Sequence, residues 1–418
     1  MLNPCLWLMH EQRAAWPARG KGTSLAQADT AGKERHNKKM LENRTSTTGE
    51  GAMTSNILHA AIFLGTTAIC HQAVSAGVAF AEEPSAIFSK PIKIFIPDKS
   101  DVKTVSESVW HPPAKAEKKS YVCVSFPTMQ DPYWIAANYG IVTEAKRLGV
   151  QVDILNAGSF SNLSAQVNQL NDCAAKGADA VLVAPISAEG VSSAVSSLKK
   201  SGIPVINIIP RIAAADNLMG RSTLDYYQVG IASAKYLRES IGDAAVKVAL
   251  LPGPAGADWA ARTLEGFKVG IADSKIEIVA VKYGDTDKNT QYNLVADTLN
   301  AFPDLNWVIG NAVAADAASG AVKAAGLSGK VKIGSTYQTG PVRDGIEKGD
   351  IEWALSDNVA LMASIGLDMA VKAVDGTLEP GTEVWPVPRK LTKDNAASDA
   401  AMAGFAPNGF KPVFSVRP

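Results

Sequence analysis

The chain has 418 residues and a formal net charge of zero, and 46% of its residues are hydrophobic. A balanced charge gives no broad electrostatic attraction for nucleic acid or for an acidic membrane surface, so both classes of partner are disfavoured. The length is too great for one ordinary hydrophobic core and suits two packed lobes.

The first apolar stretch, residues 57–70, is too short to span a bilayer and leads to Ala79-Phe80-Ala81. An apolar core followed by an Ala-x-Ala motif is typical of a signal peptide that is removed after export. We therefore expect residues 53–81 to be the signal peptide and the mature chain to lie in the periplasm.

Residues 1–52 are polar and show no hydrophobic periodicity. We interpret them as a disordered upstream extension, because Met53 would be a more ordinary start for an exported chain. Cys70 follows the bulky Ile69, whereas a lipoprotein signal needs a small residue there, so we expect no lipid anchor.

The region after residue 120 contains two cysteines, Cys123 and Cys173, and no histidine. In an oxidising compartment two thiols can form one disulfide, but two buried, unpaired cysteines are an equally good interpretation. Without histidine, this region can hold neither a Ser-His-Asp triad nor a histidine zinc site. We expect no catalysis, no metal and no cofactor.

From Ser120 onward, short β-branched runs alternate with amphipathic stretches of helical length. This alternation is typical of parallel βαβ units and predicts an α/β fold. The first expected helix is 133–148 and the last is 359–374, with others between successive strands. The expected strands are residues 121–126, 152–156, 180–184, 205–209, 246–251, 276–281, 307–310, 331–335 and 351–356.

The segments on either side of this alternation are rich in lysine or proline. We expect residues 82–119 to form an extended arm that is only partly ordered, and the proline-rich end of the chain to cross a surface. Neither GxGxxG nor GxxxxGK[ST] follows any expected strand, which weakens a nucleotide-dependent enzyme. The remaining prediction is a ligand cleft at the carboxyl ends of the strands.

Several blocks between Tyr121 and about Val387 resemble periplasmic binding proteins of the ribose-binding type, also called type 1. The resemblance implies two Rossmann-like lobes with parallel sheets, joined by a three-segment hinge. It places 120–222 with 359–386 in the first lobe, and 223–358 with 387–418 in the second. The matching blocks are Val124-Ser125-Phe126-Pro127 with Asp131-Pro132-Tyr133-Trp134, residues 176–183, residues 202–206 and Thr263-Leu264-Glu265-Gly266-Phe267.

The sequence departs from sugar binders of this family at positions that hold sugar hydroxyls. Where such proteins place an acid beside an arginine, Pro210 precedes Arg211. Where they place a Phe-Asp pair, this chain has Thr336-Tyr337, so an aromatic replaces a carboxylate. Relative to Gly266-Phe267, Arg262 lies one residue away from the position at which the family's second lobe has its binding arginine. These changes favour a ligand other than a sugar.

Within the family, the chain most resembles the periplasmic partners of trimethylamine N-oxide sensor kinases. That resemblance implies binding of trimethylamine N-oxide between the lobes and presentation of the closed form to a sensor histidine kinase, without catalysis. The two cysteines, Cys123 and Cys173, also stand where these relatives have cysteines. The residues that carry it are Asp131-x-Tyr133-Trp134, Asn138-Tyr139-Gly140, Leu251-Pro252-Gly253-Pro254, Ser335-x-Tyr337, Ala354-x-Ser356-Asp357 and Gly409-Phe410-Lys411-Pro412-Val413.

Four aromatic residues follow strands or begin helices: Tyr133, Trp134, Trp259 and Tyr337. A trimethylated nitrogen is positively charged and has no N–H, so a protein holds it with aromatic faces. We expect these four rings to form a cage around the ligand and Asp357 to add a counter-charge.

Structural roles compete with these assignments. Asp131 precedes a proline and could simply cap a helix, and Asp357 could cap the helix expected from residue 359. Trp259 could cover the lobe. Tyr133 and Trp134 are adjacent on a helix, so one of them could pack in the core, and aromatic rings also stack on sugars.

Two functions therefore stay open. The protein is a sensor partner that binds trimethylamine N-oxide, or it is the receptor of an ABC importer for a sugar or similar solute and works with a permease. A lobed gene regulator would need a DNA-reading helix-turn-helix before Tyr121, and the expected signal peptide and arm occupy that place.

Overall fold

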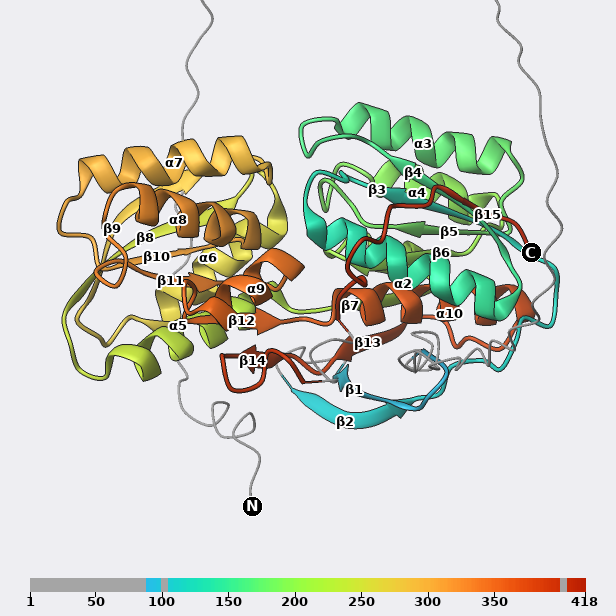
Figure 1. Cartoon of the computed structure of the whole chain (residues 1–418). Coiled ribbons are helices and arrows are strands. Elements are labelled where there is room, and N and C mark those ends of the chain that lie inside the picture. Colours follow the sequence, from blue (N-terminus) through green and yellow to red (C-terminus); the bar gives the residue numbers. More distant parts are fainter. Residues whose placement is uncertain (1–87, 99–103, 399–403) are drawn as a thin grey trace, which may run out of the picture. The chain divides into compact units, whose positions relative to one another are not determined.

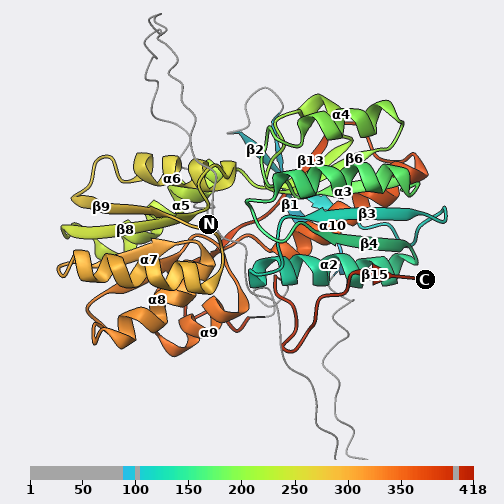
Figure 2. The same ribbon diagram turned by 90° about the horizontal axis from the view of Figure 1, so that it is seen from above.

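The computed structural model describes residues 88–98, 104–398 and 404–418. The signal peptide expected at 53–81 and the extension expected at 1–52 lie outside these residues. The described residues belong to one unit, Phe80–Pro418. They form two sheets with helices on both faces of each (Figures 1 and 2). None of the helices in this described part is both long enough and apolar enough to cross a membrane.

The first sheet has nine strands in the order β15-β4-β3-β5-β6-β7-β13-β1-β2. The run from β4 to β13 is parallel, whereas β15, β1 and β2 pair antiparallel at the two edges. The central strands are apolar because helices cover both of their faces. The strands are β1 (Ile92–Pro97), β2 (Val105–Trp110), β3 (Tyr121–Phe126), β4 (Gln151–Asn156), β5 (Ala180–Val183), β6 (Val205–Ile209), β7 (Gly220–Thr223), β13 (Thr382–Pro386) and β15 (Ser415–Val416).

The helices of the first sheet include the close pair α2 and α10. Asp131 caps α2 by accepting a hydrogen bond from the Tyr133 backbone N–H, and Pro132 occupies the first turn. A Cβ atom at Gly140 would lie 2.0 Å from the Ala360 carbonyl oxygen, so only glycine allows α10 to approach α2 this closely. The helices are α2 (Pro132–Leu148), α3 (Leu163–Ala175), α4 (Ser192–Lys200) and α10 (Val359–Asp375), with a 3₁₀ turn at Ala215–Asn217.

The second sheet has six strands in the order β14-β12-β11-β10-β8-β9, all parallel except β14. Its strands are β8 (Val246–Gly253), β9 (Ile276–Tyr283), β10 (Trp307–Gly310), β11 (Lys332–Ser335), β12 (Trp353–Ser356) and β14 (Arg389–Leu391). Its helices are α5 (Tyr226–Ile241), α6 (Asp258–Gly270), α7 (Lys288–Ala301), α8 (Ala312–Ala324) and α9 (Gly340–Lys348). The expected α/β fold with two mostly parallel sheets is confirmed.

The two flanking segments are more structured than their composition predicts. Within the expected arm, β1 and β2 form an antiparallel pair that extends the first sheet through β13. The tail was expected to join the second lobe, and β14 does pair with β12, but β15 returns to pair with β4 of the first sheet. Strand pairing between residues far apart in sequence leaves no local signal. The lobe boundaries implied by the resemblance stay a prediction.

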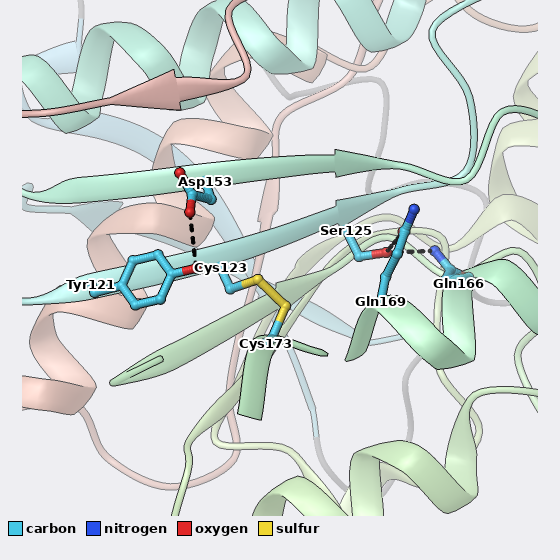
Figure 3. The surroundings of a disulfide bond; sticks show 7 residues. All are labelled: Tyr121, Cys123, Ser125, Asp153, Gln166, Gln169 and Cys173. Carbon is cyan, nitrogen blue, oxygen red and sulfur yellow. Dashed lines mark hydrogen bonds between the residues drawn. A yellow bond between two sulfur atoms is a disulfide. The ribbon is translucent and has the colours of Figure 1, made fainter. Parts of the chain in front are cut away.

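Cys123 on β3 and Cys173 on α3 are joined by a disulfide (Figure 3). Both residues are buried, and the bond ties a helix to the strand beneath it. Nearby, the Ser125 hydroxyl donates a hydrogen bond to Gln169, 2.9 Å away. Of the two interpretations that the sequence left open, the structure contains the disulfide.

Candidate ligand cavity

A small cavity of about 20 Å³ lies beside residues from both sheets. This is slightly more space than one water molecule needs. It is lined by Asp131, Tyr133, Trp134, Phe160, Ile209, Pro210, Tyr226, Trp259, Thr286, Tyr337 and Asp357. All six ligand-binding residues expected from the sequence are among them.

The lining residues come together because they follow the carboxyl ends of parallel strands. The Asp131–Trp134 segment follows β3 and begins α2, and Trp259 lies in the first turn of α6 after β8. Tyr337 and Asp357 follow β11 and β12, which are neighbours in the second sheet. Residues at these positions converge on one edge of each sheet, where α/β proteins usually bind ligands.

The aromatic rings meet mainly edge to face. The ring centroids of Tyr133 and Tyr337 are 4.9 Å apart, and those of Trp259 and Tyr337 are 6.1 Å apart. Tyr133 and Trp134 are adjacent on α2, yet their rings stand at 84° to one another and both line the cavity. Both are also buried in the core, and Trp134 packs against Phe126 with ring centroids 5.4 Å apart.

Five cavity residues were missed by sequence reasoning, and two of them, Ile209 and Pro210, lie at the end of β6. Phe160 lies in the loop after β4, with its ring centroid 6.4 Å from that of Trp134. Tyr226 is the first residue of α5 and contacts the Trp259 ring. Both follow the rule that selected Trp259, an aromatic just after a strand or at a helix start. Thr286 follows β9, and a lone threonine in a loop gives no such signal.

Two buried carboxyl groups flank the rings. Asp131 Oδ2 accepts a hydrogen bond from the Tyr337 hydroxyl at 2.5 Å, so this residue caps α2 and also contacts a ring that lines the cavity. Asp357 Oδ2 accepts one from the Tyr133 hydroxyl at 2.6 Å. Asn358, and not Asp357, occupies the N-cap position of α10, and the Asn358 side chain makes no capping hydrogen bond.

Burial raises the pKa of both carboxyl groups, to about 6 for Asp131 and about 7 for Asp357. The hydrogen bonds from Tyr337 and Tyr133 oppose this increase. Within the described residues, no lysine or arginine contributes to either shift, and Oδ1 of Asp357 and the Thr286 hydroxyl have no hydrogen-bond partner. The cavity thus combines aromatic faces with acid groups that lack a cation.

Metal binding has no support in the described part of the chain, where no group of three or more histidine, cysteine, aspartate or glutamate residues could hold an ion. The arrangement suits a small ligand that carries positive charge on an apolar surface.

Comparisons with known proteins identify the family of this chain. Residues 122–378 match the family model described as periplasmic binding protein domain. The chain is 31% identical over 304 residues to the periplasmic protein TorT of Escherichia coli K12, covering 72% of this chain and 86% of TorT.

Two solved structures are also similar. An ABC transporter solute-binding protein from Bradyrhizobium sp. BTAi1 with bound bis-tris is 35% identical, with a TM-score of 0.67, and the match covers 78% of this chain and 98% of that one. In the complex of the TorS sensor domain with TorT in the presence of TMAO, the matching chain is 26% identical. That match has a TM-score of 0.64 and covers 71% of this chain and all of that one. The chain belongs to the periplasmic binding protein family.

Proposed function

We propose that this protein binds trimethylamine N-oxide in the aromatic cavity and presents its ligand-bound form to the periplasmic domain of a membrane sensor histidine kinase. It acts in the periplasm and without catalysis. The observation that carries this proposal is a ring-lined cavity with two buried carboxyl groups and no protein cation beside them.

The chemistry of the ligand matches each part of the cavity. Its methyl groups carry the positive charge of the nitrogen, which the faces of Tyr133, Trp134 and Trp259 attract by about 0.5–2 kcal/mol each. Its oxide accepts hydrogen bonds, and the buried hydroxyl of Thr286 is available to donate one. A neutral Asp357 carboxyl could donate another. In this arrangement the methyl groups of the ligand contact the aromatic rings, and its oxide accepts a hydrogen bond from a hydroxyl group of the cavity.

The size and polarity of the cavity disfavour a pyranose ring. Each sugar hydroxyl needs a polar partner, and most of the lining residues are aromatic or aliphatic. About 20 Å³ is less space than a compact methylated amine occupies, so the rings must part to admit one. A sugar would require a larger separation.

The kinase partner is supported by the TorS–TorT complex, whose TorT chain this protein resembles. A second candidate is the receptor of an ABC importer. The Bradyrhizobium protein favours it, because that protein is described as an ABC transporter solute-binding protein and its bound bis-tris is a tertiary amine that carries hydroxyl groups.

Calorimetry of residues 82–418 tests the proposal with trimethylamine N-oxide, ribose and galactose, with and without the kinase's periplasmic domain. We expect heat only with the N-oxide, and tighter binding of the kinase domain when that ligand is present. Heat with a sugar and none with the N-oxide would refute the proposal that trimethylamine N-oxide is the ligand. Ligand binding that leaves the kinase domain unaffected would favour the importer.

Replacing Thr286 with Val tests the oxide contact, because it removes the hydroxyl and keeps the shape. We expect trimethylamine N-oxide to bind about 2- to 12-fold more weakly, from the loss of one hydrogen bond of about 0.5–1.5 kcal/mol. Tetramethylammonium has no oxide and should be unaffected. Equal losses for both ligands would show that Thr286 does not contact the oxide.

A further inference from the structure

Two loops, one from each sheet, meet beside the aromatic cavity through a hydrogen bond. The Ser159 hydroxyl donates to the Asp285 carboxylate, with Oγ and Oδ2 2.6 Å apart. Ser159 lies in the loop between β4 and α3, and Asp285 in the loop between β9 and α7. Both residues are half-buried, and neither lines the aromatic cavity. The bond therefore joins the two sheets without occupying the space of a ligand.

Each of these two residues directly precedes a residue that lines the cavity. Phe160 follows Ser159, and Thr286 follows Asp285. Consecutive Cα atoms are about 3.8 Å apart, so the two lining residues move with the loops that carry them. The charge of Asp285 also reaches the cavity, because it adds to the effect of burial in raising the pKa of Asp131. Parting the two loops therefore moves two walls of the cavity.

Side chains fix the shape of the loop that carries Ser159. The backbone N–H of Gly158, a residue with a φ of 92°, donates to the Asn156 side chain at 2.9 Å. The Asn162 side chain donates to the Ala157 carbonyl at 2.9 Å. These bonds lie on both sides of Ser159, so its hydroxyl is presented on a loop of defined conformation.

The loop that carries Asp285 is held in a similar way. Gln291 on α7 donates from Nε2 to the carbonyl oxygens of Gly284 and Asp285, at 3.1 and 2.9 Å. The Thr286 backbone N–H donates to Oδ1 of Asp285 at 2.7 Å, and Oδ2 accepts from Ser159. Because side chains order both loops, forming the bond between them costs little additional conformational entropy.

Two other hydrogen bonds between the sheets lie inside the cavity. They join the hydroxyls of Tyr133 and Tyr337 to its two carboxyl groups. A ligand that enters between the rings competes for these hydroxyl and carboxyl groups. The bond between Ser159 and Asp285 lies outside the lining, so it can persist while the ligand is bound.

We propose that Ser159 and Asp285 form a latch that holds the closed, ligand-bound form and determines how slowly the ligand leaves. The bond exists only while the two loops meet, and parting the loops returns both groups to water. Both residues act by positioning, because neither lines the cavity. The effect on the ligand rests on the proposed function, since it concerns the departure of trimethylamine N-oxide.

Stopped-flow mixing with trimethylamine N-oxide tests the latch, and the cavity residues Trp134 and Trp259 provide a fluorescence signal. Ser159→Ala removes the donor. We expect the dissociation rate constant to rise about tenfold, as the loss of a hydrogen bond to a charged group allows. The association rate constant should not fall, because the ligand enters the open form.

Ser164→Ala is the matched control, because Ser164 is exposed in the first turn of α3 and lies outside the cavity. It should change neither rate constant. Circular dichroism checks that each variant is folded.

A double-mutant cycle shows whether the two residues act through one another. Asp285→Asn keeps an oxygen for the Thr286 N–H and removes the charge, so by itself it should raise the dissociation rate constant severalfold. In the Ser159→Ala protein the same replacement should add nothing. The cycle is measured at pH 8, where Asp131, with a pKa of about 6, is ionised in all of these proteins. Effects that multiply would show that the residues act separately, and would refute the latch.

Hydrogen exchange of the ligand-free protein is a second measurement, which needs no ligand. Ser159→Ala should speed exchange at the backbone N–H groups of Gly284 and Thr286 on the opposite loop. An unchanged dissociation rate constant in Ser159→Ala would overturn the latch and leave the proposed function standing. If the unsubstituted protein does not bind trimethylamine N-oxide, the proposed function fails and hydrogen exchange decides. Equal exchange in the two proteins would then overturn the latch as well.

Discussion

Two pairs of buried carboxyl groups lie along the same two helices, α2 and α10, and their surroundings differ. At the start of the helices, Asp131 and Asp357 face the aromatic cavity. Farther along, Glu144 on α2 and Asp368 on α10 are both buried as well. The pair of Glu144 and Asp368 has an arginine beside it, whereas the pair of Asp131 and Asp357 has no protein cation beside it among the described residues.

The second pair is neutralised from within the protein. Arg147 donates from Nε to Glu144 at 2.9 Å, and its guanidinium lies 3.7 Å from Asp368. The indole N–H of Trp110, at the end of β2, donates to Asp368 at 2.8 Å. Burial raises the pKa of Asp368, and the neighbouring Glu144 raises it further.

The difference between the pairs supports the proposal that Asp131 and Asp357 serve a ligand. Buried charge is stable only when it is paired, so the protein supplies a cation where the carboxylates are structural. At Asp131 and Asp357 it supplies none, and aromatic rings lie beside the two carboxyl groups instead. If the proposed function holds, we expect a ligand with positive charge to stabilise this pair.

The largest expected effect comes from replacing Arg147 with Met. This leaves two buried carboxyl groups without their cation, and the free energy of unfolding should fall by about 3–5 kcal/mol. Urea denaturation at neutral pH measures the change. Lys146→Met, at the exposed neighbouring position on α2, should change the stability little. A loss for Arg147→Met as small as that control would show that the two pairs do not differ as argued.

The cavity is tested through its ligand affinity, although stability should fall as well because both rings are buried. The double replacement of Trp134 and Tyr337 with Ala removes two rings at about 0.5–2 kcal/mol each, so the Kd for trimethylamine N-oxide should rise by about 5- to 900-fold. Calorimetry measures the affinity and circular dichroism the fold. Tyr283→Ala is a control, because that tyrosine is exposed on β9. A folded double variant with unchanged affinity would exclude the cage.

The smallest expected effect is a change of affinity with pH. Because burial raises the pKa of Asp357 to about 7, its carboxyl becomes ionised only as pH rises through that value. Tetramethylammonium, a permanent cation, should bind more tightly at pH 8 than at pH 6, whereas the net-neutral N-oxide should change less. Asp357→Asn should flatten the response to the cation. An identical response in this variant would assign the titration to another group.

The stability of the ligand-free protein should also depend on the ionisation of Asp357. It should fall as the pH rises, whereas the affinity for the cation should increase. A pKa raised above its ordinary value near 3.8 favours the folded state below that value. The contribution is lost as pH rises through about 7, because the folded protein then buries a charge. The melting temperature of Asp357→Asn should therefore fall less than that of the unsubstituted protein between pH 4 and 8. Parallel curves would contradict this.

The sequence by itself predicted the fold class and most of its regular elements. Strands such as β3 and β6, and helix α5, lie where the β-branched runs and helical periodicity placed them. It missed α9, which has nine residues and begins with Gly340-Pro341, a pattern more typical of a turn. Local pattern is sufficient wherever an element buries a continuous apolar face, and it fails for short or polar elements.

The sequence also selected four of the six aromatic residues and both aspartates of the cavity, because the ends of parallel strands are predictable positions. Tertiary structure alone decided what surrounds them. That Asp131 bonds to Tyr337, 206 residues away, and that Arg147 serves the other carboxyl pair, depend on contacts between distant segments. Burial and the absence of a neighbouring cation are properties of the folded environment. They set the charge of the site, and no local pattern of residues records them.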